Sequence, residues 1–118
     1  PYVLLNMVTR GMDNYAVMDM LYMKNKPEEY KHVRGNVKYK YLVRLFKYLE
    51  RLDIESINNN KYTIGESYDL PNLIVRLDDL RLFFEKYEEY ERCNVIKNTI
   101  TMLYDQSVKQ ISDEKLLI

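Results

Sequence analysis

The two residue types best suited to nucleophilic or metal chemistry occur once each in this chain. His32 is the only histidine and Cys93 the only cysteine among the 118 residues. A metal site built on several histidines is therefore excluded, and Cys93 has no second cysteine with which to form a CxxC pair or an intramolecular disulfide. A nucleophilic Cys–His pair would need a fold that brings these two residues together, and nothing in their spacing indicates one.

The carboxylate pairs have the wrong spacing for acid–base or metal chemistry. Asp78-Asp79 and Glu88-Glu89 are adjacent in the sequence, so on a helix their side chains point about 100° apart and cannot closely share a proton or a metal. The chain also contains no GxxxxGK[ST], GxGxxG or HExxH motif, which phosphate, dinucleotide and zinc sites use. The sequence therefore predicts a non-catalytic protein without a cofactor or a metal site.

Positive charge is concentrated in one stretch of a chain whose net charge is zero. Residues 24–51 contain nine basic and three acidic residues, whereas residues 53–92 contain five basic and ten acidic residues. Four of the cations recur at steps of 4, 3 and 4 residues, which on a helix makes a stripe about 16 Å long; they are Lys40, Arg44, Lys47 and Arg51. With Arg34 and Lys38, these residues are the candidates for gripping the phosphates of a nucleic acid.

Two other interpretations of the basic stripe remain open. It can be the solvated face that lies opposite the apolar face of an ordinary amphipathic helix. It can also pair with acidic side chains near the end of the next long helix, which are Glu85, Glu88, Glu89 and Glu91. Because the chain as a whole has no net positive charge, nucleic-acid binding is the alternative function rather than the leading one.

A heptad pattern predicts a long helix from about residue 70 to residue 92. Its apolar residues follow one another at steps of 3, 4, 3, 4 and 3, and they are Leu70, Leu73, Leu77, Leu80, Phe84 and Tyr87. About two and a half heptads are too few for an independent coiled coil, so we interpret this helix as the spine of a bundle. Apolar residues also lie beside the seam, and Val75, Leu82 and Phe83 are the candidates for contacting a partner protein.

The remaining segments predict shorter helices and one irregular stretch. Helical periodicity covers residues 2–10, about 14–24, 27–32, 37–54 and 94–111. Gly11 is expected to cap the first segment, and Gly35 to interrupt the chain between the third and the fourth. Residues 56–69 are expected to be irregular, with one short β-bridge near residues 61–64. The predicted fold is an all-α, single-domain bundle of about five helices.

The amino-acid composition indicates the kind of genome and the cellular compartment in which we expect the protein. Twelve tyrosines against a single alanine indicate the codon bias of an AT-rich genome, viral genomes among them. A single cysteine fits a reducing, intracellular compartment, cytoplasm or nucleus, and no apolar run approaches the ~18 residues of a membrane span. The chain ends on an apolar run and begins without methionine, so we expect a fragment of a longer protein. The leading hypothesis is a helical interaction or assembly domain, such as a viral adaptor, that binds another protein or a second copy of itself.

Overall fold

Four helices form the described part of the chain. The computed structural model describes residues 2–52 and 70–116, except for the side chains of residues 2, 3, 107 and 109–116. The helices are α1 (Tyr2–Asn25), α2 (Pro27–Glu50), α5 (Leu70–Lys86) and α6 (Tyr90–Leu116). The all-α prediction is confirmed, whereas the expected count of about five helices is slightly too high for the described residues. The β-bridge expected near residues 61–64 lies outside them.

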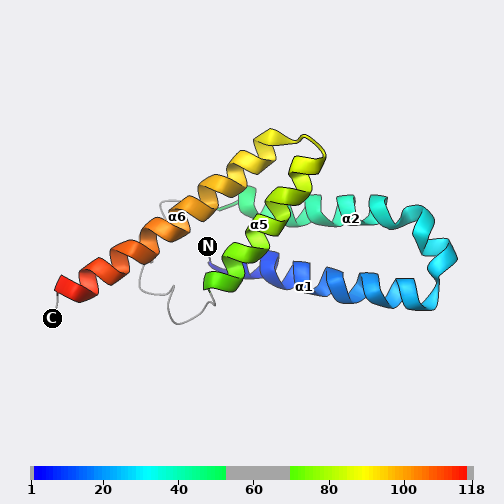
Figure 1. Cartoon of the computed structure of the whole chain (residues 1–118), viewed down its shortest axis with the longest axis horizontal. Helices are drawn as coiled ribbons and strands as arrows, with labels where there is room; N and C mark the ends of the chain where they lie inside the picture. Colours follow the sequence, from blue (N-terminus) through cyan, green and yellow to red (C-terminus); the bar gives the residue numbers. More distant parts are fainter. Residues whose placement is uncertain (1, 53–69, 117–118) are drawn as a thin grey trace.

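The helices form two antiparallel hairpins, one crossing the other. The α5–α6 hairpin lies across one end of the longer α1–α2 hairpin and leaves its other end, where α1 turns into α2, uncovered (Figure 1). The molecule is consequently elongated, with extents of 60 × 28 × 19 Å. We call residues 2–16 and 38–50 the covered end of the α1–α2 hairpin, and residues 17–37 its free end.

Neither of the two glycines expected to interrupt the first hairpin ends a helix. Gly11 is buried inside α1, where an added Cβ would collide with the side chain of Leu45 on α2. Its role is therefore close approach of two helices rather than capping. Gly35 is exposed inside α2, and among the described residues no atom beyond its chain neighbours and the adjacent backbone of α2 lies within 4 Å of its Cβ position. The four helical segments expected before residue 54 are thus two continuous helices, separated only at Lys26.

The boundary between the last two helices also differs from the sequence prediction. The helix expected to reach Arg92 ends at Lys86, and α6 already begins at Tyr90. Glu88 adopts a left-handed φ of 58°, and the N–H of Glu89 donates to the carbonyl of Phe84 at 3.1 Å. This is the bonding of a Schellman cap, whose left-handed position is usually glycine. Because a glutamate occupies it here, the sequence carried no stop signal.

The seam of α5 lies at the centre of the hydrophobic core. Leu77, Leu80 and Phe84 are fully buried, and Leu73 is nearly so. They pack against residues of all three other helices, including Leu5, Val8, Leu42, Leu45, Phe46, Leu49, Cys93, Ile96 and Leu103. Tyr87, the last position of the expected seam, lies beyond the end of the helix and is half exposed. The structure therefore supports the interpretation of this helix as a bundle spine, shortened by one position.

Candidate functional site

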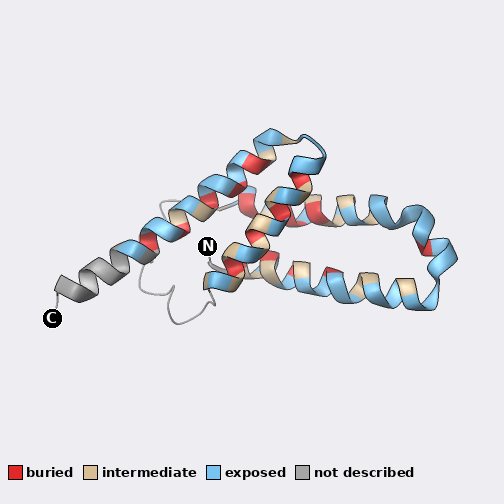
Figure 2. Cartoon of the chain, viewed as in Figure 1, coloured by how far each residue is buried: buried red, intermediate tan, exposed pale blue. Residues whose placement is uncertain are grey.

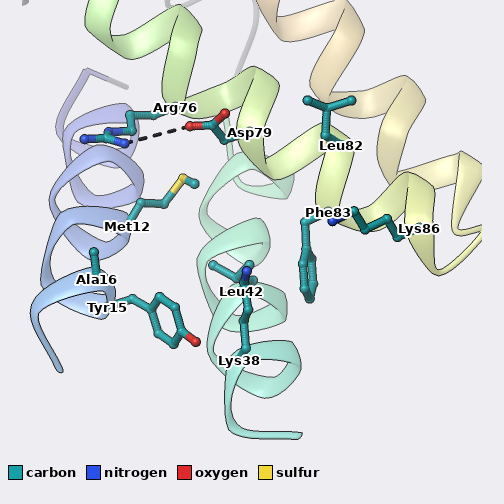
Figure 3. Close-up of a pocket in the computed structure, with 10 residues that line it drawn as sticks. All are labelled: Met12, Tyr15, Ala16, Lys38, Leu42, Arg76, Asp79, Leu82, Phe83 and Lys86. Carbon is teal, nitrogen blue, oxygen red and sulfur yellow. Dashed lines mark ion pairs between the residues drawn. The ribbon is translucent and has the colours of Figure 1, made fainter. Parts of the chain in front are cut away.

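A cleft opens where α5 crosses the α1–α2 hairpin (Figure 3). Its volume is about 420 Å³. The lining residues come from three helices: Met12, Tyr15 and Ala16 of α1, Lys38 and Leu42 of α2, and Arg76, Asp79, Leu82, Phe83 and Lys86 of α5. Leu82 is an apolar side chain of the lining that is 44% exposed. The lining combines apolar and charged side chains, and clefts of this size are a usual form of binding site.

The structure brings together two of the three residues predicted to contact a partner. Leu82 and Phe83 line the cleft, whereas Val75 is exposed on α5 outside its lining. The ring of Phe83 is held by its neighbours, with centroid distances of 5.4 Å to Phe84 and 5.1 Å to Tyr87. The aromatic wall of the cleft is therefore fixed in place rather than free to collapse into the opening.

One arginine joins the helices on either side of the cleft. Nη2 of Arg76 lies 2.8 Å from a carboxylate oxygen of Asp13 on α1, and Nη1 lies 3.8 Å from Asp79, one turn along α5. The side chains of these two pairs are 36–50% exposed, so each pair contributes little to stability, about 0–1 kcal/mol. Their larger effect is to join α1 to α5 beside the cleft, with one positive charge shared between two carboxylates.

The basic stripe is separated from two of the residues predicted to extend it. Lys40, Arg44 and Lys47 are exposed on α2 and Arg51 is exposed directly after its end. Within the described residues no ion pair involves these four cations. Arg34 instead binds a carboxylate of α1, and Lys38 lies in the cleft. The continuous surface therefore consists of four cations rather than six.

Two of the acidic residues expected near the basic stripe have other partners. Glu85 binds Arg81 at 3.0 Å, on its own helix. The hydroxyl of Tyr39 donates to Glu89 at 2.6 Å, and this hydrogen bond to a carboxylate raises the pKa of the tyrosine. Glu89 also lies 3.7 Å from Arg92. Of the three interpretations of the basic stripe, pairing with these glutamates loses its support.

A separate polar cluster holds the free end of the hairpin together. Asp19 of α1 accepts hydrogen bonds from the Tyr30 hydroxyl at 2.7 Å and from Nε and Nη2 of Arg34 at 2.9 and 2.8 Å. The bond from Arg34 lowers the pKa of Asp19, while burial raises the pKa of Tyr30. Because all three groups satisfy one another, this cluster stabilises the hairpin and does not present a reactive group.

The residues that could have formed a nucleophilic pair are placed in different surroundings. His32 is exposed near the start of α2, in the free end. Cys93 is buried in the core, where its thiol donates to the carbonyl of Arg81 at 3.4 Å. Within the described residues, no group of three histidine, cysteine, aspartate or glutamate side chains could hold a metal ion.

Comparison with known proteins gives no match, so the argument about function depends on the surfaces of this structure. No family model, curated protein or solved structure matches this chain. Among the described residues, no helix combines the length and hydrophobicity needed to cross a membrane.

Three residues of the cleft are not predicted by the sequence alone, namely Met12, Tyr15 and Lys86. Their place in the cleft depends on where α5 crosses the hairpin.

Proposed function

We propose that this chain is a non-catalytic protein-interaction domain whose docking site is the cleft between α1, α2 and α5. The observation that carries the proposal is the 44% exposure of Leu82, an apolar side chain that lines the cleft together with Met12 and Phe83. An exposed leucine on a surface loop or helix is ordinary, but one in the lining of a cleft that combines apolar and charged side chains is a typical anchor point for a partner.

The polar groups of the cleft favour binding over catalysis. The side chain of Arg76 lies between the carboxylates of Asp13 and Asp79, so these three groups pair with one another instead of converging on an empty position where a substrate atom could react. The partner is another protein or a second copy of this chain. The single cysteine, which is buried and unpaired, fits an intracellular setting.

The test is a selection of peptides from a random phage-displayed library on the purified protein. Selected peptides should lose at least tenfold in affinity on Leu82→Asp, because a buried charge replaces an apolar anchor. Val75→Asp is the matched control, since Val75 is 55% exposed on the same helix but outside the cleft, and it should leave affinity unchanged. Circular dichroism should show the same helix content in both variants.

Two results would overturn this function. The first is that no enriched peptide depends on Leu82. The second is that Val75→Asp weakens binding as much as Leu82→Asp does, which would place the contact elsewhere on α5. Concentration-dependent self-association in light scattering, abolished by Leu82→Asp, would support the proposal with a second copy as the partner.

A second candidate function is nucleic-acid binding by Lys40, Arg44, Lys47 and Arg51, because these four cations are exposed and have no ion pair within the described residues. Fluorescence anisotropy with a labelled single strand and a labelled duplex tests it. Affinity should fall steeply as salt rises, since phosphate contacts release counterions. Charge reversal at Lys40 and Arg44 should abolish binding; unchanged affinity after that reversal would exclude this function.

A further inference from the structure

The charges around the cleft are unbalanced. Four charged side chains line it, three of them basic: Lys38, Arg76, Lys86 and Asp79. The one acidic group, Asp79, already lies near Arg76, which also binds Asp13. Within the described residues, no carboxylate pairs with Lys38 or Lys86. The cleft therefore has an excess of positive charge that its own residues do not neutralise.

The two lysines lie beside the apolar part of the cleft rather than apart from it. The ammonium group of Lys38 is 5.3 Å from the centroid of the Phe83 ring, within the distance at which a cation is attracted to an aromatic face. Lys86 follows Leu82 by one helical turn on α5. In Figure 3 the Phe83 ring lies between the two lysine side chains. A ligand that buries an apolar group here would bring its neighbouring groups close to two cations.

We propose that the occupant of this cleft is an amphipathic helix of a partner protein that carries carboxylates beside its apolar side chains. This inference rests on the proposed function and adds the chemistry of the partner. Apolar side chains of that helix, spaced at three and four residues, contact Leu82, Phe83 and Met12. Its glutamates or aspartates bind Lys38 and Lys86, since complementary charge selects partners and speeds association.

The walls of the cleft favour a helix over an extended strand. An extended peptide obtains much of its affinity by pairing its backbone with an open sheet edge, and the described residues contain no strand. A helix satisfies its own backbone hydrogen bonds and needs only an apolar groove for its side chains. The three helices that line this cleft offer side chains, with their backbone groups already bonded within each helix.

The test uses two fluorescein-labelled helical peptides with the same leucine positions, one with glutamates and the other with lysines beside them. The wild-type protein should bind the acidic peptide at least tenfold more tightly at low salt, and the difference should shrink as salt screens the charges. The double variant Lys38→Glu, Lys86→Glu should reverse the preference. Lys38→Met with Lys86→Met should remove the preference without reversing it.

The matched control is Lys24→Glu with Lys97→Glu, which changes the net charge equally but at exposed positions of α1 and α6 outside the cleft; it should leave the preference for the acidic peptide intact. Equal binding of both peptides by wild type, or a preference that follows the control variant, would overturn the acidic-helix inference. Library peptides that depend on Leu82 but carry no excess of acidic residues would overturn it too, while leaving the interaction function standing. Loss of all Leu82-dependent binding would overturn both.

Discussion

The covered and free ends of the α1–α2 hairpin are held together by different physical means. At the covered end, apolar side chains of α1 and α2 meet the seam of α5, and Leu5, Val8 and Leu42 are almost completely buried. At the free end most side chains are exposed (Figure 2). The contact between the helices there depends on Asp19, Tyr30 and Arg34, and on Tyr22 stacked on Tyr30 at 5.4 Å.

The difference shows how a hairpin can extend beyond its core. Apolar contacts need to be covered from several sides before they exclude water, whereas a hydrogen-bonded cluster can join two helices that have solvent around them. A third helix, α5, covers the apolar side chains of the hairpin and excludes water from them at one end only. The same crossing helix also creates the cleft, because it covers the hairpin as far as Tyr15 on α1 and Lys38 on α2 and ends there.

The largest expected effect is on the core of the covered end. Phe84 is fully buried against Phe46 at a centroid distance of 5.6 Å, so Phe84→Ala should lower the free energy of unfolding by about 3–5 kcal/mol. The milder Ile96→Val, also in the core, should cost about 0.5–1.5 kcal/mol. Leu21→Ala at the free end, where the side chain is 48% exposed, should cost less than about 1 kcal/mol. Urea unfolding measures all three, and equal effects would contradict the comparison.

Next in size is the contrast between the two helical glycines. Gly35→Ala should stabilise the protein by about 0.5–1 kcal/mol, because alanine is the better helix former and its Cβ meets open space. Gly11→Ala gains the same helix propensity, but its Cβ forces Leu45 to move in a packed core. It should therefore be less favourable than Gly35→Ala by about 1–3 kcal/mol. The difference in urea midpoints tests this; equal shifts would mean that α1 and α2 approach less closely than described.

An effect of similar size, but confined to the free end, is expected from removing the polar centre of that end. Asp19→Ala leaves the buried hydroxyl of Tyr30 without its acceptor, which should cost about 1–3 kcal/mol. The loss should be seen first as faster amide hydrogen exchange in residues 17–37, with little change in the covered end. Glu28→Ala is the control, since Glu28 makes only an exposed pair with Lys31 at 3.9 Å. Uniformly faster exchange in both ends would show that the two ends do not unfold separately.

The smallest effect should appear in the pH dependence of stability. Because Arg34 lowers the pKa of Asp19 from its ordinary 3.8, the carboxylate stabilises the folded state above that value, and this contribution is lost as pH falls through the lowered pKa. Burial raises the pKa of Tyr30 above its ordinary 10.0, so its contribution is present below 10.0 and is lost as pH rises through the raised pKa. The melting-temperature difference between wild type and Asp19→Ala should therefore be constant from about pH 5 to 9 and narrow on the acid side. A difference that stays constant below pH 3 would contradict this.

Local patterns in the sequence determined the fold class and the spine of the bundle. The helical spacing of Leu73, Leu77, Leu80 and Phe84 is a property of consecutive residues, and burial follows wherever a partner helix covers that face. The wrong predictions concern helix ends, which were expected at glycines. Gly11 and Gly35 were interpreted by their usual role as helix breakers, whereas neighbouring helix packing decides whether a glycine is a cap or a contact. The true stop at Glu88 lacks a glycine altogether.

The candidate site was predicted only in part, and for a physical reason. Leu82 and Phe83 are predicted as contact residues because they are apolar but do not belong to the heptad seam, and both line the cleft. Val75 met the same criterion but lies outside it. Met12, Lys38 and Lys86 lie up to 74 positions apart in the chain, and only the crossing of α5 over the hairpin brings them to one surface. Periodicity shows which face of a helix is apolar, while the tertiary arrangement decides which part of that face remains open to a partner.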